Sequence, residues 1–164
     1  MKLLRGAQED EAVQWMHHAA RVARHARCSR AKCGTVIVKN GEIIGEGYNA
    51  PPLDAEGNRM CNAIHTKGKP KYDATCCMHA EWRAILDALK RNPEKVKNAA
   101  LYFVRVSDAG DIKKSGKPYC TVCSRLALDA GLATFALWHE EGIGEYPAAE
   151  YNSLSYGYIH EAGQ

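Results

Sequence analysis

The sequence predicts an α/β protein built in three layers, with helices on both faces of a sheet. One observation is a β-hairpin signal: strand-like runs at 34–39 and 42–48 flank Asn40-Gly41, and a tight type I′ turn needs positive φ at both central residues. The other is that, beyond the hairpin, helical periodicity alternates with short apolar runs rich in β-formers. The 164 residues fit one domain spanning 1–164, with no repeat or evident linker.

The first element expected is a helix over about 8–27, followed by the hairpin of 34–48. The helix shows an apolar stripe at helical spacing, formed by Val13, Met16, Ala20 and Ala23. After the hairpin, residues 49–76 form a long irregular stretch rich in Pro, Gly and Asn. A stretch of that length inside a compact domain is usually functional, is partly disordered or contains structure that the pattern does not show.

The second half alternates between helices and buried strands. A helix is expected over 79–90, with an i, i+3, i+4, i+7 pattern of Trp82, Ile85, Leu86 and Leu89 and with Pro93 beyond its end. A buried strand at 99–106 and a polar insertion at 107–117 come next. The remaining elements are a helix over 119–130 that Gly131 can cap and a strand at 133–138; the tail after Trp138 has no clear assignment.

Composition excludes several classes of protein. Apolar residues make up 46% and charged residues 25%, which is ordinary globular usage and argues against disorder. The net charge of +3 is too small to indicate nucleic-acid binding by itself. The first residues lack the apolar stretch of a signal peptide, and no segment has the apolar run needed to cross a bilayer. The expected location is the cytoplasm, without membrane association.

Seven cysteines are unusual for a cytosolic chain. In a reducing compartment they are ligands, catalytic groups or small core residues more often than disulfides, and an odd number fits a bridge framework poorly. Two of them belong to a pattern that points to a metal.

The segment Cys77-Met-His79-Ala-Glu81 stands at the start of the expected second helix, and Pro118-Tyr-Cys120-Thr-Val-Cys123 stands at the start of the third. Cysteines at i and i+3 share one helix face, so Cys120 and Cys123 can reach the same ion. Two thiolates and the His79 imidazole make a three-ligand Zn²⁺ site that leaves the fourth position open, whereas structural zinc sites are normally closed by four protein ligands. Zinc in such a site lowers the pKa of water towards neutrality. Glu81 need not bind the metal and is the expected proton shuttle.

The four residues His79, Glu81, Cys120 and Cys123 closely resemble the signature of the cytidine/deoxycytidylate deaminase superfamily. The resemblance extends over roughly 29–138 and includes the hairpin Gly34-Thr-Val-Ile-Val-Lys-Asn-Gly-Glu-Ile-Ile-Gly-Glu-Gly-Tyr-Asn49, which looks like that of deoxycytidylate and tRNA-adenosine deaminases. It implies zinc-dependent hydrolytic deamination, a mixed five-stranded sheet flanked by helices and a homo-oligomer. It also implies substrate contacts from Asn49, which ends the hairpin, and from the backbone of Ala80.

Two positions depart from the family pattern. Tyr119 stands between Pro118 and Cys120, where the family usually has Pro directly before the first Cys. Arg83 stands two residues after Glu81, where the deoxycytidylate pattern has Asn. Neither residue is an expected metal ligand, so the zinc site is unaffected. Both lie close to where substrate would sit, so they bear on the choice of substrate.

Several other groups allow two interpretations. The basic stretch around Arg21, Arg24 and Arg27 favours a solvated helix face over a phosphate or nucleic-acid site. The tyrosines of the tail are interpreted as packing residues in preference to a surface on which a base stacks. The remaining cysteines are interpreted as small core residues in preference to ligands of a second, structural zinc site. The donors available for such a site are Cys28, Cys33, Cys61, His65, Cys76 and Cys77.

Three functions are compatible with the motif. The favoured one is deamination of a small cytosine nucleotide or nucleoside of the dCMP type. The second is deamination of a base within RNA or DNA, or of another aminated ring such as a purine or an antibiotic. The third is an inactive, zinc-stabilised interaction module, against which Glu81 argues because a structural site has no use for a carboxylate that is not a ligand.

Overall fold

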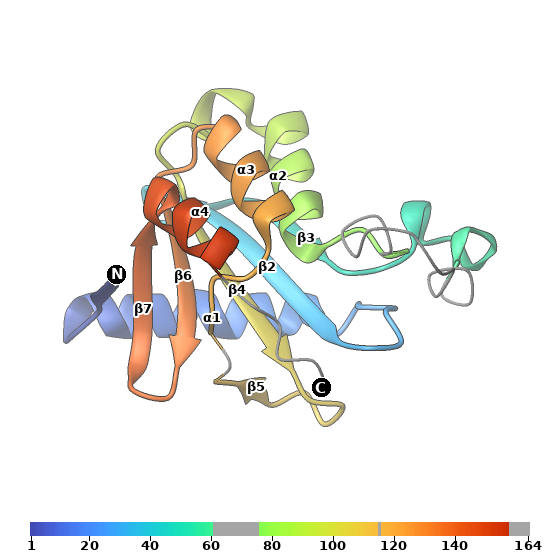
Figure 1. Cartoon of the computed structure of the whole chain (residues 1–164), viewed down its shortest axis with the longest axis horizontal. Coiled ribbons are helices and arrows are strands. Elements are labelled where there is room, and N and C mark those ends of the chain that lie inside the picture. The colour runs from blue at the N-terminus through green and yellow to red at the C-terminus, as the bar shows by residue number, and fades with distance from the viewer. Residues whose placement is uncertain (61–75, 115, 158–164) are drawn as a thin grey trace.

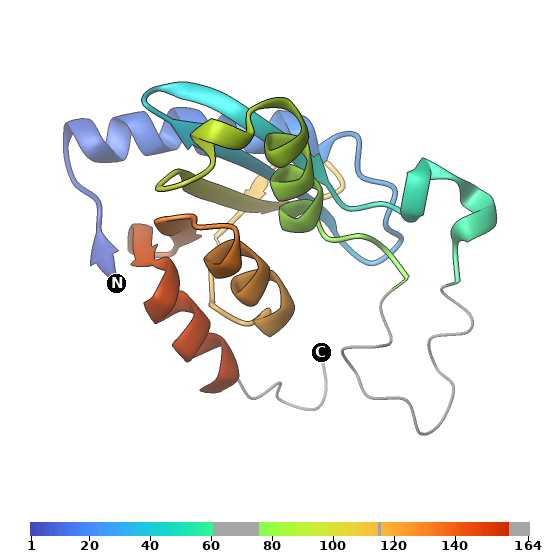
Figure 2. The same cartoon turned by 90° about the horizontal axis from the view of Figure 1, so that it is seen from above.

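Helices lie on both faces of a mixed sheet, which confirms the predicted three layers (Figure 1, Figure 2). The protein is described by a computed structural model over residues 1–60, 76–114 and 116–157. The strands are β1 (Lys2–Leu3), β2 (Lys32–Lys39), β3 (Glu42–Tyr48), β4 (Ala100–Val106), β5 (Ile112–Lys113), β6 (Thr134–His139) and β7 (Gly142–Pro147). The α-helices are α1 (Ala7–Ala23), α2 (Ala80–Arg91), α3 (Thr121–Asp129) and α4 (Ala148–Gly157), and the short 3₁₀ helices are η1 (Pro52–Asp54), η2 (Glu56–Asn58) and η4 (Pro93–Lys95).

The sheet runs in the order β1-β7-β6-β4-β2-β3, with β5 paired to β4. β4 and β6 are parallel, and the other pairs are antiparallel. Asn40 and Gly41 have φ values of 52° and 75°, so the β2–β3 hairpin has the tight turn that their sequence predicts. β3 and β4 are each antiparallel to β2, so β3, β4 and β6 all run in the same direction. The helix α2 connects β3 to β4, and α3 lies between β5 and β6, so the starts of both helices can meet on one face of the sheet.

Two apolar cores form, one on each face of the sheet. Successive residues of β2 point to opposite faces, so Val36 packs towards α1 and Ile37 packs towards α2. The α1 core also contains Met16 and Ile143, and the opposite core contains Ile85, Leu101 and Phe135. In the view from above, α1 lies on one side of the sheet and α2, α3 and α4 lie on the other (Figure 2). Burial on both faces explains why β2 reads as a nearly continuous apolar run.

The sheet has seven strands instead of the expected five. The two additional strands, β1 and β5, have two residues each, which is too short for an alternating pattern to reveal them. The unassigned tail forms β7 and α4. Glycines at two positions weaken the strand signal of β7, and the buried face of α4 consists of Ala148, Tyr151 and Ser155, which is not an apolar stripe.

The first helix ends at Ala23, earlier than the expected Arg27. The backbone N–H groups of Arg24, His25 and Ala26 bond to carbonyls three residues back, so the chain tightens and turns before β2. The stretch expected to be irregular contains η1 and η2 in its described part. In the described part of the chain, no helix combines the length and apolarity that a membrane span requires.

Gly47 of β3 lies against the first turn of α2. A Cβ atom there would come within 2.2 Å of the Ala80 carbonyl oxygen and 2.4 Å of the Ala84 nitrogen, both of them backbone atoms. Gly47→Ala is therefore expected to push α2 off the sheet and to lower the free energy of unfolding by about 2–4 kcal/mol. Urea denaturation measures this change. The matched control is Gly57→Ala, whose Cβ meets nothing within 4 Å, and equal stability of the two variants would contradict the close helix–strand packing.

Candidate active site

His79, Cys120 and Cys123 lie together between the starts of two helices. His79 is the N-cap residue of α2, and Cys120 is the N-cap residue of α3. The His79 Nδ1 atom is 3.2 Å from the Cys123 Sγ atom and 3.5 Å from the Cys120 Sγ atom, and the two sulfur atoms are 3.0 Å apart. All three potential ligand atoms lie within 4.8 Å of one another. The predicted proximity of these residues is confirmed.

Glu81 lies in the first turn of α2 beside this group. Its side chain is 5% exposed, and it interacts electrostatically with His79 and hydrogen-bonds the Cys123 thiol. Burial raises the pKa of the Glu81 carboxyl, and the neighbouring His79 only partly offsets this effect. A buried carboxyl whose pKa is raised is well suited to exchange protons near neutral pH.

The two thiols and the imidazole lie close enough to shift one another's pKa values. The hydrogen bond from the Cys123 thiol lowers the pKa of Cys120 to about 4, and His79 acts in the same direction. Burial raises the pKa of Cys123 well above its ordinary value. Burial alone would lower the pKa of His79, but Cys120 and Glu81 outweigh it and raise that pKa. The helix N-termini add partial positive charge that favours thiolate.

Asn49 is held against the start of β2 by its side-chain amide. Its Oδ1 atom accepts a hydrogen bond from the Cys33 N–H at 2.8 Å, and its Nδ2 atom donates one to the Ala31 carbonyl at 2.8 Å. The next residue, Ala50, forms a two-way backbone bridge with Met78, one residue before His79. Asn49, the expected substrate contact, is thus tied to the segment that carries His79, the first expected ligand. Its side-chain amide keeps one Nδ2–H and one Oδ1 lone pair for further hydrogen bonds.

The departure at Arg83 has a structural explanation. The Arg83 guanidinium forms an ion pair with Asp54 at 3.1 Å, donates to the Pro51 carbonyl at 2.8 Å and lies 5.0 Å above the Tyr48 ring. Tyr48 also donates to Asp54 at 2.8 Å. Arg83 therefore joins α2 to the η1 turn, a use that the sequence did not signal because its partners lie in a stretch without periodicity.

A family model for the cytidine and deoxycytidylate deaminase zinc-binding region matches residues 9–137. The chain belongs to that family. The match includes the hairpin, both helix starts and all four residues of the metal and carboxylate cluster, and it ends at the last residue but two of β6.

Two relatives show the same relationship. The chain is 32% identical over 94 residues to a deoxycytidylate deaminase of Schizosaccharomyces pombe, a match that covers 54% of this chain but 28% of that protein. It is 31% identical over 121 residues to a deoxycytidylate deaminase of Mycobacterium phage D29, covering 70% of this chain and 83% of the phage protein.

Solved structures share the fold. The dCMP deaminase of the cyanophage S-TIM5 in apo form has a TM-score of 0.55 at 21% identity, covering 77% of this chain and 80% of its own. A cytidine deaminase of Burkholderia pseudomallei has a TM-score of 0.56 at 16% identity, covering 85% and 94%. The family architecture predicted from the motif is confirmed.

The residues present fit the zinc ion that this family binds. Zinc–sulfur bonds of about 2.3 Å and zinc–nitrogen bonds of about 2.0 Å place a tetrahedral nitrogen and sulfur roughly 3.5 Å apart and two sulfurs roughly 3.8 Å apart. The separations here are 3.2 and 3.5 Å for nitrogen to sulfur and 3.0 Å for sulfur to sulfur, so small outward shifts of the side chains would accommodate the ion. Two sulfurs and one imidazole nitrogen are also the soft and borderline donors that zinc prefers. Three protein ligands leave one position for water or substrate.

The second zinc site considered from the sequence remains untested. Among the described residues, the group of His79, Cys120 and Cys123 is the one cluster of three or more potential ligands. The Cys76 and Cys77 sulfur atoms are 3.8 Å apart, and Cys77 also interacts with Cys28. Of the other three potential donors, Cys33 is buried in the core, and Cys61 and His65 lie outside the described residues.

The tail packs against the core, as favoured. Tyr146 and Tyr151 are 4% and 2% exposed, and the Tyr151 ring stacks on Phe135 with the ring centres 4.0 Å apart. Ser124, next to the predicted ligand Cys123, donates to Asn152 of α4 at 2.9 Å. The tail therefore supports α3, which carries two of the three predicted ligands, a role that sequence reasoning missed. Tyr156 is exposed, and Tyr158 lies outside the described residues.

Trp82 is a further residue that sequence reasoning assigned only to an apolar stripe. Its ring stacks on the His79 imidazole, with the ring centres 4.7 Å apart and an angle of 13° between the planes. The i, i+3 spacing of the two residues at the start of a helix was the available signal. The stacking limits rotation of the imidazole and so helps to orient the Nδ1 atom.

Trp82→Ala is expected to accelerate zinc loss to a chelator about tenfold, because neighbours that orient a ligand typically contribute that much to metal retention. Trp82→Phe should restore most of the retention, since a smaller ring can still stack. The measurement is the rate of zinc transfer to a coloured chelator. Leu86→Ala, an exposed position one turn further along α2, is the control, and a wild-type rate for Trp82→Ala would contradict the positioning role.

Proposed function

We propose that the chain hydrolytically deaminates a free cytosine nucleotide, with dCMP as the preferred substrate. The observation that carries this proposal is a buried glutamate beside three potential zinc ligands at two helix starts. The relatives support the substrate class, because both are deoxycytidylate deaminases. The cyanophage S-TIM5 dCMP deaminase has also been solved in complex with dCMP and dUMP, with a TM-score of 0.53 at 23% identity to this chain.

In this reaction water replaces the exocyclic amino group, so that a cytosine ring and water give a uracil ring and ammonia. His79, Cys120 and Cys123 would hold the zinc ion. When bound, zinc supplies a Lewis acid that makes water acidic enough to react near neutral pH. Glu81 would accept a proton from the attacking water and deliver it to the ring nitrogen. It would then take the proton of the new hydroxyl group and pass it to the departing amine, and a buried carboxylate with a raised pKa suits both transfers.

Asn49 and Ala80 would contact the substrate. Ala80 is the first residue of α2 and lies between His79 and Glu81, so its backbone is adjacent to both the metal ligand and the proton shuttle. Asn49 can offer its remaining amide hydrogen and lone pair while its other bonds keep it fixed. A side chain held in place before substrate arrives loses little entropy on binding.

Ammonia release from a panel of amino compounds tests the substrate. Zinc-loaded protein would be assayed with dCMP, CMP, deoxycytidine, cytidine, cytosine, adenosine, guanine, single-stranded DNA and tRNA. We expect dCMP to give the highest kcat/KM. A higher value for a purine or for a base within a polynucleotide would refute the proposed substrate class but retain deamination. If zinc-loaded protein releases no ammonia from any of these compounds, the proposed deamination is refuted.

The same proposal includes a single domain over 1–164, a homo-oligomer and a cytoplasmic location. Exposed leucines on neighbouring helices support self-association, since Leu86 and Leu89 of α2 and Leu128 of α3 are each 41–42% exposed. Sedimentation equilibrium gives the mass of the particle in solution and so tests the oligomer directly.

A further inference from the structure

Arg83 lies between the helix that carries His79 and the turn that follows Asn49. Its Nη1 atom is 3.1 and 3.2 Å from the two carboxylate oxygens of Asp54, and its Nη2 atom donates to the Pro51 carbonyl at 2.8 Å. The backbone N–H of Arg83 bonds to the His79 carbonyl, as the geometry of α2 requires. One guanidinium therefore connects the first turn of α2 to the η1 turn.

The η1 turn has an unfavourable backbone conformation. Leu53 and Asp54 are consecutive residues with φ values of 59° and 57°, in the left-handed region that residues with a Cβ atom disfavour. Leu53 is 90% exposed, so its own packing does not hold the turn. The Asp54 carboxylate accepts from Arg83 and from the Tyr48 hydroxyl, and the Asp54 carbonyl accepts from the Arg27 Nη1 atom at 2.7 Å. Removing the Arg83 guanidinium would therefore allow this turn to relax.

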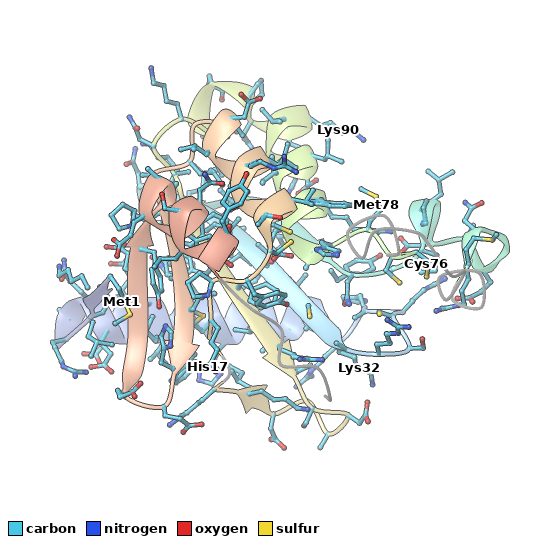
Figure 3. All side chains as sticks on the ribbon, in the orientation of Figure 1. Met1, His17, Lys32, Cys76, Met78 and Lys90 are labelled. Atoms are coloured by element: carbon cyan, nitrogen blue, oxygen red, sulfur yellow. The ribbon has the colours of Figure 1, made fainter. Side chains whose placement is uncertain are left out.

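Two separate groups of bonds hold the segment around Asn49. The Asn49 side-chain amide bonds to the start of β2, so it fixes this residue to the sheet. The bonds between Ala50 and Met78 and between Pro51 and Arg83 fix the same segment to the start of α2 instead. Figure 3 shows Met78 beside that end of α2. The second group of bonds therefore sets the gap between Asn49 and α2.

We infer that Arg83 is a positioning residue that holds Asn49 at the distance from α2 at which the substrate fits between them. This inference rests on the proposed function, in which Asn49 and Ala80 contact the substrate. Arg83 itself is not expected to touch the substrate, because its side chain is 19% exposed, its Nη atoms bond to protein oxygens and its Nε atom is buried. Asp54 balances its charge: burial alone would raise the pKa of that carboxyl, but the hydrogen bonds from Arg83 and Tyr48 outweigh burial and lower the pKa.

Arg83→Met should raise KM for dCMP at least about tenfold and lower kcat less than about threefold, because a misplaced binding residue weakens the ground state and the transition state alike. Zinc content should stay that of the wild type. Arg83→Lys should give an intermediate KM, since an ammonium group keeps the charge opposite Asp54 but lacks the planar fork that reaches two acceptors. Arg91→Met is the matched control: it removes another arginine of α2 that pairs with an aspartate, Asp87, and should keep the wild-type KM.

Hydrogen–deuterium exchange tests the connection without any substrate. The amide hydrogens of Ala50 and Met78 bridge the two segments. In zinc-loaded Arg83→Met they should exchange at least about tenfold faster than in the wild type, because hydrogen bonds from a charged group no longer hold the bridge closed. Exchange in β6 should not change, which checks that the variant is folded. Since this measurement does not depend on deamination, the connection can stand while the proposed function fails.

Unchanged exchange at Ala50 and Met78, or a KM that stays at the wild-type value, would overturn the inference. The double variant Arg83→Met/Asp54→Asn should keep the raised KM. A return to the wild-type KM in the double variant would also overturn the inference, because the effect would then come from an unpaired carboxylate and not from lost positioning. If the wild type deaminates no compound of the panel, the proposed function fails, and the exchange rates alone decide whether Arg83 connects the two segments.

Discussion

Replacing Glu81 with glutamine is expected to lower kcat by at least about a thousandfold while the chain keeps its zinc. General acid–base groups contribute roughly 10²–10⁴-fold to rate, and Glu81 would act in several successive proton transfers. Glutamine has nearly the same shape but cannot accept the proton that water must lose. The residue is 5% exposed and belongs to the first turn of α2, so bulk solvent has little access to take over its role.

Two measurements separate this effect from damage to the site. Zinc content per chain should equal that of the wild type, and KM for the best substrate should change far less than kcat, because a group used mainly in the transition state affects kcat and kcat/KM together. Glu94→Gln, at an exposed position after the same helix, is the control and should keep wild-type rates. Near-normal turnover of Glu81→Gln would refute the proposed proton shuttle.

Replacing Cys123 with serine is expected to remove one equivalent of zinc and all measurable activity. Cys123 is fully buried, and its sulfur lies 3.2 Å from the His79 Nδ1 atom and 3.0 Å from the Cys120 sulfur. A hydroxyl is a much harder and less acidic donor than a thiol, so the remaining two ligands would hold zinc weakly. Metal bound a thousandfold above its Kd stabilises the fold by about 4 kcal/mol, so Tm should fall by roughly 10 °C.

Metal analysis and calorimetric unfolding measure the two changes. Cys33→Ala is the matched control, because it removes another buried thiol while the backbone N–H that holds Asn49 stays in place. It should retain zinc, and its Tm should not respond to added zinc differently from that of the wild type. Treating the wild type with a chelator should reproduce the loss of Tm seen in Cys123→Ser. A Cys123→Ser variant with full zinc content would refute the ligand assignment.

Local patterns were sufficient to predict the two halves of the metal cluster. His79 and Glu81 lie in one helical turn, as do Cys120 and Cys123, so each pair is arranged by helix geometry alone. The hairpin is equally local, because Asn40-Gly41 specifies its turn without help from distant residues. The separate roles of these residues, and of Asn49 and Ala80, stay predictions until the variants are measured.

Features that depend on distant contacts were not predictable in this way. Trp82 fits an apolar stripe, and only the packed helix shows that its ring stacks on His79. Arg83 departs from the family pattern, but its partner Asp54 comes from a turn without any periodic signal. The short strand β1 forms along the outer strand β7, and β5 pairs with the end of β4 that extends beyond β6. Both pairings are a property of the sheet and not of two residues.

The sequence by itself determined the chemistry available to this protein and the two helix starts that carry it. Those features rest on residue type and on spacings within one helical turn, where covalent geometry leaves few alternatives. Only the tertiary structure decided that the two helix starts meet, that α4 supports α3, and that Arg83 connects α2 to the η1 turn. Each of these requires segments tens of residues apart to pack against one sheet, and the free energy that selects such packing is spread over two whole apolar cores.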